Sequence, residues 1–517
     1  MISLEERGRN SIGRAAIAAL GFLLQVVWIL FQVHKIHDYY PVTAGITKAI
    51  AILVVLRIYG KHTKSDIKIP WMVLLLVFPV AGLVFYILFQ GNASLYFTKK
   101  KFRSIVGKLG SNLESDDELL DDIYNMDLSL YGQSHYISKT GGYPAYRGCQ
   151  VEYHKDADIG IEAQKRELKK AKNFIFMEYH AIEDSVSFRN IEDILEKKVK
   201  EGVDVRIIYD DMGSVGFIGK SFRQRLKEKG IKCLVFNPML PFLNVFMNNR
   251  DHRKITVIDG KVGFTGGYNL ADRYFNIDSP YGYWKDTGMM IKGRAVDSFT
   301  VMFLEMWYAI NPQEMEEENI RDYINITKEN YADNGGIVQP YGENPLIEEL
   351  LAENVYLNMA KNAKKYLYIM TPYLLIDDST NDELVLAAKR GVDVRIITPG
   401  IPDKKLIYKM TRSYYNALAR GGVKIYEYTP GFMHAKQYIC DDSVAALGTI
   451  NMDYRSLYLH FENGVLMYNM GEIAKIKEDF DDVLSESKEV TKDYLNDKRS
   501  LSKRIIQCLL RFFAPLL

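Results

Sequence analysis

Two short segments of this 517-residue chain carry the same ionisable residues at the same spacing, H-x-K-x4-D. The residues are His252, Lys254 and Asp259 in the first copy, and His434, Lys436 and Asp441 in the second. Residues i and i+2 of a strand share one face, so each histidine is expected beside its lysine. An imidazole can attack phosphorus or carry a proton, and a lysine can hold a phosphate oxygen. Each segment therefore predicts phosphate chemistry.

Both segments continue into a second shared pattern, in which a glycine and a small residue precede an asparagine. The matched pairs are Gly266 with Gly448, Gly267 with Thr449, and Asn269 with Asn451. An asparagine amide is a neutral donor, and we expect Asn269 and Asn451 to bind the substrate phosphate. If the two copies meet, two imidazoles lie on opposite sides of one phosphorus atom, as in-line displacement requires. This residue set needs no metal ion and no other cofactor.

The elements that would position these motifs are also duplicated. The text "GVDVRII" occurs at Gly202–Ile208 and again at Gly391–Ile397. Each copy follows an apolar stretch and a polar helical stretch, Asn190–Glu201 or Asn381–Arg390, and begins with a glycine where a helix C-cap belongs. This order is typical of a β-α-β unit. We predict an α/β fold of two homologous half-domains packed with pseudo-twofold symmetry.

Three apolar runs precede the duplicated part. Ala15–Val33 has no charged residue, Ile69–Phe89 is nearly all apolar, and Val42–Tyr59 is interrupted by Lys48 and Arg57. A helix needs about twenty apolar residues to cross a bilayer. We therefore expect two to three N-terminal transmembrane helices and a multi-pass protein of the cell membrane. Basic residues flank the runs on both sides, so the sequence leaves open which side the soluble part faces.

These patterns divide the chain into five segments. They are a membrane region at 1–98, a linker at 99–135, a first half at 136–325, a second half at 326–485, and a C-terminal segment at 486–517. The last ends in Ser500–Leu517, where apolar residues form one helical stripe beside Lys503, Arg504 and Arg511. This pattern predicts an amphipathic helix, either at an anionic lipid interface or docked on the protein itself.

Composition narrows the function. The net charge is +1, which argues against a nucleic-acid partner. The cysteines are Cys149, Cys233, Cys440 and Cys508. They show no paired spacing, so neither a zinc site nor a disulfide framework is expected. His180 and His460 lie near the motifs in strand-like runs, and we interpret both as core histidines rather than ligands.

The double pattern H-x-K-x4-D, followed by G-G/T-x-N, resembles the phospholipase D superfamily. The texts "HRKITVIDGKVGFTGGYNLADRY" and "HAKQYICDDSVAALGTINMDYRSLYLHFENGV" are similar to bacterial cardiolipin synthases. The resemblance runs from about Val42 onward and is most specific across the two motifs. One departure is Thr449, which stands where the first motif has Gly267. The superfamily tolerates such small residues at this position.

The resemblance implies roles for individual residues. One motif histidine would form a phosphohistidine, and the other would protonate the leaving alcohol and activate the incoming one. His252 is the candidate nucleophile and His434 the candidate acid/base, although the two could be exchanged. An acid later in each half would orient a histidine, and Asp286 and Glu462 sit at suitable places.

The two motif aspartates and the substrate complete the expectation. Asp259 and Asp441 belong to the catalytic motif, but the resemblance implies that they are more structural than chemical. The implied reaction joins two phosphatidylglycerol molecules into cardiolipin and glycerol, with phosphatidylglycerol and anionic membrane lipid as partners. The alternatives are a lipid hydrolase, a synthase using serine or ethanolamine, a nuclease of the same superfamily, and a non-catalytic lipid-binding scaffold. The sequence does not predict the oligomeric state.

Overall fold

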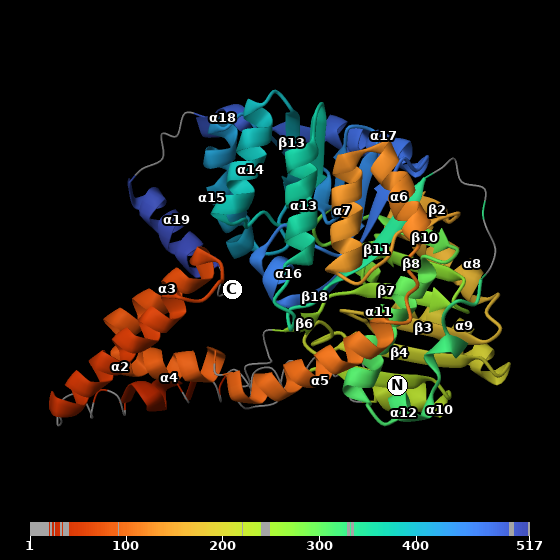
Figure 1. Ribbon diagram of the computed structural model, residues 1–517, viewed down its shortest axis with the longest axis horizontal. Helices are drawn as coiled ribbons and strands as arrows, with labels where there is room; N and C mark the ends of the chain where they lie inside the picture. The colour runs from red at the N-terminus through yellow and green to blue at the C-terminus, as the bar shows by residue number, and fades with distance from the viewer. Residues whose placement is uncertain are drawn as a thin grey trace.

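The computed structural model covers the predicted halves and part of the N-terminal region (Figure 1). It describes residues 41–90, 92–219, 221–238, 249–327, 336–495 and 501–514, and positions 20, 23–24, 26–31, 34 and 331. The apolar run Ala15–Val33, predicted to span a membrane, lies mostly outside the described residues.

The first half is built on a sheet centred on the predicted β-α-β unit. β3 (Phe174–Tyr179) and β4 (Asp204–Asp210) pair in parallel, and α9 (Val186–Lys200) connects them. Gly202 follows α9 with φ +90°, a conformation that glycine adopts without strain. The described strands of this sheet run in the order β2-β10-β8-β7-β3-β4-β5. The remaining bounds are β2 (Gln150–His154), β5 (Lys232–Phe236), β7 (Lys254–Ile258), β8 (Val262–Gly266), β10 (Gly288–Lys292), α8 (Ala157–Leu168) and α10 (Phe222–Glu228).

The second half repeats this arrangement. β12 (Tyr366–Met370) and β13 (Asp393–Pro399) are parallel, α14 (Asp378–Lys389) connects them, and Gly391 has φ +95°. The described strand order is β1-β11-β18-β17-β16-β12-β13-β14-β19. The remaining bounds are β1 (Tyr146–Arg147), β11 (Ile337–Glu343), β14 (Lys424–Tyr428), β16 (Gln437–Cys440), β17 (Val444–Gly448), β18 (His460–Tyr468), β19 (Ser487–Glu489), α13 (Leu351–Asn362), α15 (Lys405–Arg420) and α16 (Tyr454–Tyr458).

Two equivalent helices fill the space between the sheets. α11 (Val296–Ile310) follows β10 and packs against β3 and β7 of the first sheet and β11 of the second. α17 (Glu472–Ser485) follows β18 and packs against β14 and β16 of the second sheet and β2 of the first. Every side chain from Val296 to Tyr308 is buried, so α11 is part of the shared core. The predicted α/β fold with two homologous halves is confirmed.

Short parallel strand pairs also join the halves at two equivalent places. They are β6 (Arg250–Asp251) with β18, and β15 (Gly431–Met433) with β9 (Tyr283–Lys285). β6 and β15 each end at the residue before a motif histidine. The backbone N–H of His252 donates to Phe461 O at 2.8 Å, and that of His434 donates to Lys285 O at 2.7 Å. Both motif histidines are therefore fixed by backbone bonds to the opposite half.

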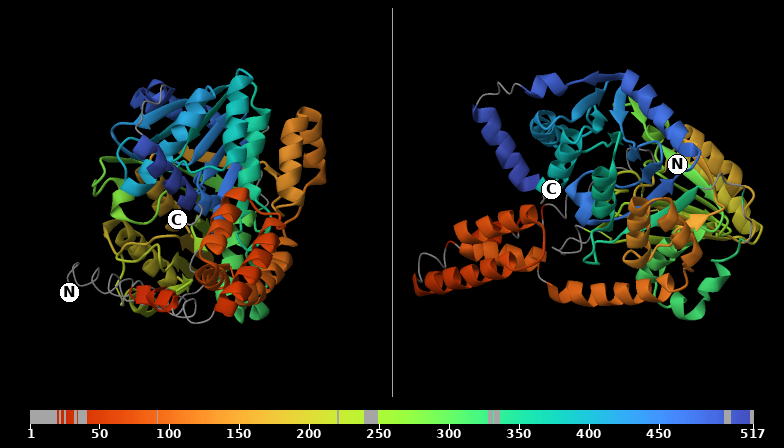
Figure 2. Two further views of the ribbon diagram at one scale, coloured as in Figure 1. Left: turned by 90° about the vertical axis from the view of Figure 1, so that its left-hand side faces the viewer. Right: turned by 45° about the horizontal axis from the view of Figure 1, so that its top comes forward.

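Helices lead into this body from the N-terminal side. They are α2 (Pro41–Tyr59), α3 (Ser65–Val77), α4 (Pro79–Gln90), α5 (Asn92–Gly110), α6 (Asp117–Met126) and α7 (Leu128–Lys139). α2, α3 and α4 pack on one another and project away from the two halves (Figures 1 and 2). α5 packs along α11 and connects this bundle to the body.

The apolar run Ile69–Phe89 does not form the single helix that we expected. α3 ends at Val77 and α4 begins at Pro79. Proline lacks an N–H and disfavours helical geometry at the residue before it, and Phe78 accordingly leaves the helix with φ −127° and ψ 72°. Among the described residues, no helix combines the length and the apolarity needed to cross a bilayer. The predicted transmembrane helices are therefore not confirmed.

The C-terminal segment returns to the N-terminal bundle. The predicted amphipathic helix is α19 (Leu501–Phe513), preceded by α18 (Thr491–Leu495). α19 packs against α15 and α3, with Leu510 partly buried against the core. Ile505, Ile506 and Leu509 remain exposed. The helix therefore docks on the protein and still presents apolar side chains outward. The other short helices are α12 (Glu314–Glu317), η2 (Asp272–Phe275) and η3 (Ile320–Asp322).

Candidate active site

Both motif histidines line one cavity between the two halves. Its volume is about 670 Å³, and its wall includes His252, His434, Asn269 and Asn451. Asn269 is fixed at both ends of its amide, because Oδ1 accepts from the N–H of Ala181 at 3.0 Å and Nδ2 donates to Tyr274 Oη at 2.8 Å. The structure thus brings the equivalent histidines and asparagines of the two motifs together, as the duplication predicts.

The two motif lysines are buried beside the histidines. Lys254 Nζ donates to the backbone oxygen of His252 at 2.6 Å, and Lys436 Nζ makes the same bond to His434. Burial lowers the pKa of Lys254 to about 8 and that of Lys436 to about 7. A buried ammonium group has lost the water that would stabilise its charge. A bound anion close to the two lysines would stabilise their charged forms in place of that water. The lysines therefore favour a bound phosphate.

Each histidine is paired with the predicted acid, and the pairing crosses between the halves. His252 Nδ1 lies 2.8 Å from Glu462 Oε2, and His434 Nδ1 lies 2.6 Å from Asp286 Oδ2. A carboxylate at Nδ1 fixes the tautomer and leaves Nε2 for the substrate. The bridging strands explain the crossing. In the register of β6 with β18, Asp251 lies opposite Phe461, so the next pair is His252 with Glu462.

The difference between Gly267 and Thr449 has a steric cause. A Cβ at Gly267 would overlap Asp286 Oδ1, so only glycine leaves room for this carboxylate. Thr449 instead donates its hydroxyl to Glu462 Oε2 at 2.5 Å. Burial raises the pKa of Glu462 well above its ordinary value. The threonine hydroxyl counteracts this rise by stabilising the charged form. The two halves thus support their acids by different means.

The motif aspartates do not face the cavity. The carboxylate of Asp259 accepts from the N–H groups of Lys172, Asn173 and Phe174 at 2.8, 2.7 and 2.9 Å. Asp441 does the same for the three residues Lys364, Lys365 and Tyr366 in the second half. Each aspartate therefore fixes the start of one central strand to the end of the motif strand. This geometry agrees with the structural role that the resemblance implies.

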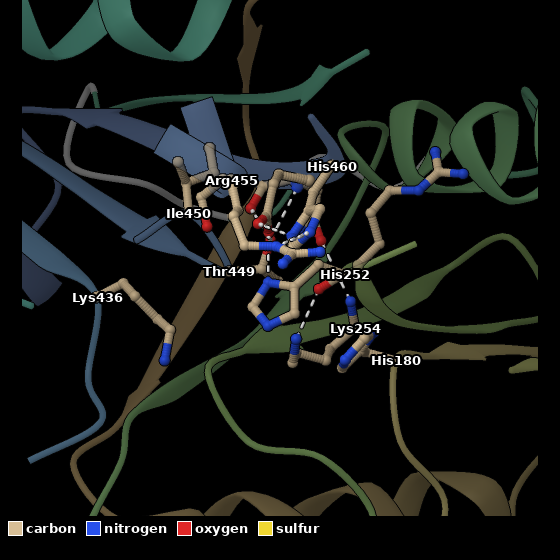
Figure 3. A network of polar contacts seen from close by, with 12 residues as sticks. His180, His252, Lys254, Lys436, Thr449, Ile450, Arg455 and His460 are labelled. Atoms are coloured by element: carbon tan, nitrogen blue, oxygen red, sulfur yellow. Dashed lines mark hydrogen bonds and ion pairs between the residues drawn. The ribbon is translucent and has the colours of Figure 1, made fainter. Parts of the chain in front are cut away.

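A group of basic residues around His252 was not foreseen as part of the site. The rings of His180 and His460 lie 4.9 and 5.7 Å from that of His252, and Arg455 Nε donates to His460 Nε2 at 3.2 Å (Figure 3). All three line the cavity. We interpreted the two histidines as core residues. His460 is indeed buried, but strand alternation places it on the same face as Glu462, a signal that the sequence did contain.

His434 has an aromatic environment instead. The rings of Trp284, Tyr274 and Phe432 lie 5.2, 5.4 and 5.7 Å from its imidazole. Trp284 precedes Asp286 by two residues, as His460 precedes Glu462, so a tryptophan in one half occupies the place of a histidine in the other. Faces of aromatic rings favour a nearby cation, whereas clustered basic groups oppose one. The two histidines are therefore electrostatically unequal.

Both imidazoles are neutral near pH 7. Burial lowers the pKa of His434 to about 4, with Lys436 acting in the same direction and Asp286 opposing it. Burial lowers the pKa of His252 well below its ordinary value, with Lys254 and His180 adding to the effect. A neutral ring keeps the lone pair needed for attack on phosphorus. A phosphate anion between the lysines raises the pKa of both rings and makes protonation of one of them accessible.

Three potential metal-ligand atoms lie within 4.8 Å of one another, one each from His252, His460 and Glu462. Such a group could hold a metal ion. Glu462 Oε2 is already bonded to His252 and to Thr449, however, so a metal would have to displace the bonds that orient the histidine. The geometry favours the role in orientation.

Comparison with known proteins agrees with this geometry. The family described as "Cardiolipin synthase, PLD-like domain" matches residues 165–307 and 356–484, which include both motifs and both acids. The chain belongs to this family. A second family, "Phospholipase D-nuclease N-terminal", matches residues 49–91, which include α3, α4 and the larger part of α2.

Relatives in the cardiolipin synthase family match over most of their length. A cardiolipin synthase of Geobacillus sp. (strain WCH70) is 32% identical over 516 residues, which cover 98% of this chain and all of that protein. A cardiolipin synthase of Halalkalibacterium halodurans is 33% identical over 90% of this chain and 91% of its own. The crystal structure of phosphatidylserine synthase from Haemophilus influenzae shares the fold, with a TM-score of 0.54, 15% identity, and coverage of 71% of this chain and 93% of that one.

The lowered lysine pKa values predict that anion binding weakens with rising pH. Sulfate is a suitable probe because its own charge is constant between about pH 6 and 9. We expect the sulfate dissociation constant to rise by up to about tenfold per pH unit above pH 7 to 8, as Lys436 and then Lys254 lose their protons. Isothermal titration calorimetry of the purified protein measures this.

Lys436→Arg is the control for that titration. A guanidinium keeps its charge throughout this range, so the loss of sulfate affinity should move to higher pH. A sulfate affinity that is flat from about pH 6 to 9 in the wild-type protein would contradict the role of the two lysines.

Proposed function

We propose that this protein is a cardiolipin synthase that transfers a phosphatidyl group from one phosphatidylglycerol molecule to another, releasing glycerol. The observation that carries the proposal is the convergence of both motif histidines and both motif asparagines on one cavity. Each motif lysine is bonded to the backbone of its histidine, and each histidine is held by a carboxylate of the other half. The family match and the cardiolipin synthase relatives support the choice of substrate. The reaction replaces one alcohol by another at the same phosphodiester. The bond formed and the bond broken are of the same kind, so the reaction needs no energy from a nucleotide.

The reaction has two balanced steps. In the first, Nε2 of one histidine attacks phosphorus while the bond from phosphorus to the glycerol oxygen breaks, and the other histidine donates a proton to that oxygen. In the second, a hydroxyl of another phosphatidylglycerol gives its proton to the second histidine and attacks phosphorus, and the P–N bond breaks. Lys254, Lys436, Asn269 and Asn451 would hold the non-bridging oxygens during both steps.

We assign the nucleophile to His252 and the acid/base to His434. His252 stands among Lys254, His180 and His460, which disfavour its protonation and keep its lone pair available. His434 stands among aromatic rings and beside Asp286, which oppose the effect of Lys436, 2.9 Å from its Nδ1, and favour an imidazolium once the substrate phosphate is bound. This assignment separates two residues that the sequence pattern treats alike.

We further propose a multi-pass membrane location, with the N-terminal region as the anchor. The uncharged run Ala15–Val33 is long enough to span a bilayer, and α2 to α4 expose many large apolar side chains. A catalytic cavity next to such helices meets lipid headgroups at high local concentration.

The central prediction concerns the products. Purified protein mixed with phosphatidylglycerol in detergent should release cardiolipin and glycerol in equal amounts without added metal or nucleotide. Thin-layer chromatography of the lipids and an enzymatic glycerol assay measure both. His252→Asn and His434→Asn should each lower the rate by at least about a thousandfold. Phosphatidic acid as the main product would show that the protein is a hydrolase.

The roles assigned to the two histidines predict that only one of the two variants accumulates the covalent phosphatidyl intermediate. A phosphatidyl ester of p-nitrophenol has a leaving group that needs no protonation, so the first step no longer requires the acid. With this substrate, His434→Asn should accumulate a covalent phosphatidyl adduct and release one equivalent of nitrophenol, whereas His252→Asn should give neither. Intact-protein mass spectrometry and absorbance detect the two signals. An adduct on His252→Asn alone would exchange the two roles.

The membrane location predicts resistance to extraction. Membranes from expressing cells, washed with alkaline carbonate, should retain the full-length protein, because an anchor buried in hydrocarbon does not depend on charge. A variant lacking residues 1–90 should be released. Immunoblotting of pellet and supernatant shows whether each protein is retained or released. Release of the full-length protein would contradict the proposed membrane location.

A further inference from the structure

A second crevice lies beside the catalytic cavity, between α3, α15 and α19. Its volume is about 440 Å³. Its wall has an apolar or aromatic part, with Ile69, Pro70, Tyr414, Ala417, Cys508 and Phe512 contributed by the three helices. The rest of the wall is polar, and it includes Asp66, Asp378, Ser413, Asn416, Gln507 and Arg511. Figures 1 and 2 show α19 next to α3, on the side from which the N-terminal bundle projects. Neither the motifs nor the proposed reaction uses these residues.

The crevice adjoins the catalytic cavity. Tyr454 lines both of them. It belongs to the short helix α16 and lies between Asn451 and Arg455, which also line the catalytic cavity. Ala514, the residue after α19, is buried and lines the catalytic cavity. The crevice and the catalytic cavity therefore share a wall at Tyr454.

Polar bonds fix the wall that α3 provides. Lys64, just before α3, binds the buried carboxylates of Glu353 at 2.7 Å and Asp377 at 2.9 Å. Asp66 in the first turn of α3 accepts a hydrogen bond from Tyr454 Oη. Removing the half-buried ammonium would leave two buried carboxylates without their cation, which is unfavourable, so α3 keeps its position relative to α16. The crevice is consequently a defined feature of the fold rather than a loose gap between helices.

Two of the helices that form the crevice expose large apolar side chains. α3 exposes Ile69, Val73, Leu76 and Val77, and α19 exposes Ile505, Ile506 and Leu509. An apolar surface of this extent is unfavourable in water and is typical of contact with lipid or protein. A cation stands beside it, because the guanidinium of Arg511 lies 4.5 Å from the ring of Tyr414 and 4.0 Å from Asp378.

We propose that this crevice binds an acyl chain of the phospholipid substrate and guides its phosphodiester from the lipid surface into the catalytic cavity. A ligand that occupies both the crevice and the cavity needs an apolar end for the crevice and an anionic end for the site of the motif lysines. A phospholipid has both. The inference rests on the proposed function for the identity of the headgroup. The inference adds a binding place for the acyl chain of the lipid. It also gives α19 a role, because this helix forms the wall of the crevice opposite α3.

Cys508 allows a direct test. All four cysteines lie in the part of the chain that the structure describes, and Cys508 is the exposed one, since Cys149 and Cys440 are buried and Cys233 is half-buried. Full-length protein is alkylated with N-pyrenylmaleimide and assayed with two substrates that share a headgroup, dioleoyl-phosphatidylglycerol in vesicles and monomeric dihexanoyl-phosphatidylglycerol. We expect the label to lower cardiolipin formation from the dioleoyl lipid by at least about tenfold and from the dihexanoyl lipid by less than about twofold.

Two matched variants separate the crevice from general effects on α19. Cys508→Ser should be insensitive to the reagent. Ile506→Cys in the Cys508→Ser background carries the same label on the exposed face of the same helix, and it should keep the ratio of the two rates near that of untreated protein. An equal loss with both lipids, or the same loss from the label at position 506, would overturn the crevice assignment.

Protection of the thiol gives a second measurement that does not require turnover. Dioleoyl-phosphatidylglycerol in vesicles should slow alkylation of Cys508 by at least about fivefold, and dihexanoyl-phosphatidylglycerol should not. Absence of this protection contradicts the crevice even if cardiolipin forms. Protection without any cardiolipin from untreated protein would instead refute the proposed function and leave the chain-binding crevice standing.

Discussion

The active site depends on two carboxylate–imidazole pairs that cross between the halves, Glu462 with His252 and Asp286 with His434. Neither half contains a complete pair. The parallel strand pairs β6–β18 and β9–β15 set the register that places each acid opposite its histidine. α11 and α17 then bury the contact between the sheets. A slip of one residue in either pair would turn the acid to the other face of its strand, so these short bridges govern the site.

The duplicated scaffold supports an unequal pair of histidines. His252 lies among basic groups and His434 among aromatic rings, although their motif neighbours are equivalent. The halves also differ at Gly267 and Thr449. Gly267 leaves room for Asp286, whereas Thr449 donates a hydrogen bond to Glu462. These differences give the two equivalent positions unequal surroundings.

The N-terminal bundle is joined to the second half close to the cavity. Lys64 and Asp66 connect the start of α3 to Glu353, Asp377 and Tyr454, and α19 packs on the same helix from the other end of the chain. The start of α3 and the C-terminal helix α19 thus lie beside the short helix α16 (Figure 1). This arrangement suits an enzyme whose substrate arrives from a lipid surface, since the apolar helices and the catalytic residues form one continuous structure.

Patterns along the chain were sufficient to predict what local chemistry controls. The repeat and the glycines at 202 and 391 predicted two β-α-β units, and the motifs predicted one cavity with both histidines. Asp286 and Glu462 were found through resemblance. The face taken by His460 and the break before Pro79 follow from strand alternation and proline chemistry, which are signals that the sequence contains. The crossing of the pairs, the contact of His180 with His252 and the crevice beside α19 required the tertiary structure. Strand periodicity fixes which face a side chain takes, whereas its partners depend on the register between segments about two hundred residues apart, which no local pattern encodes.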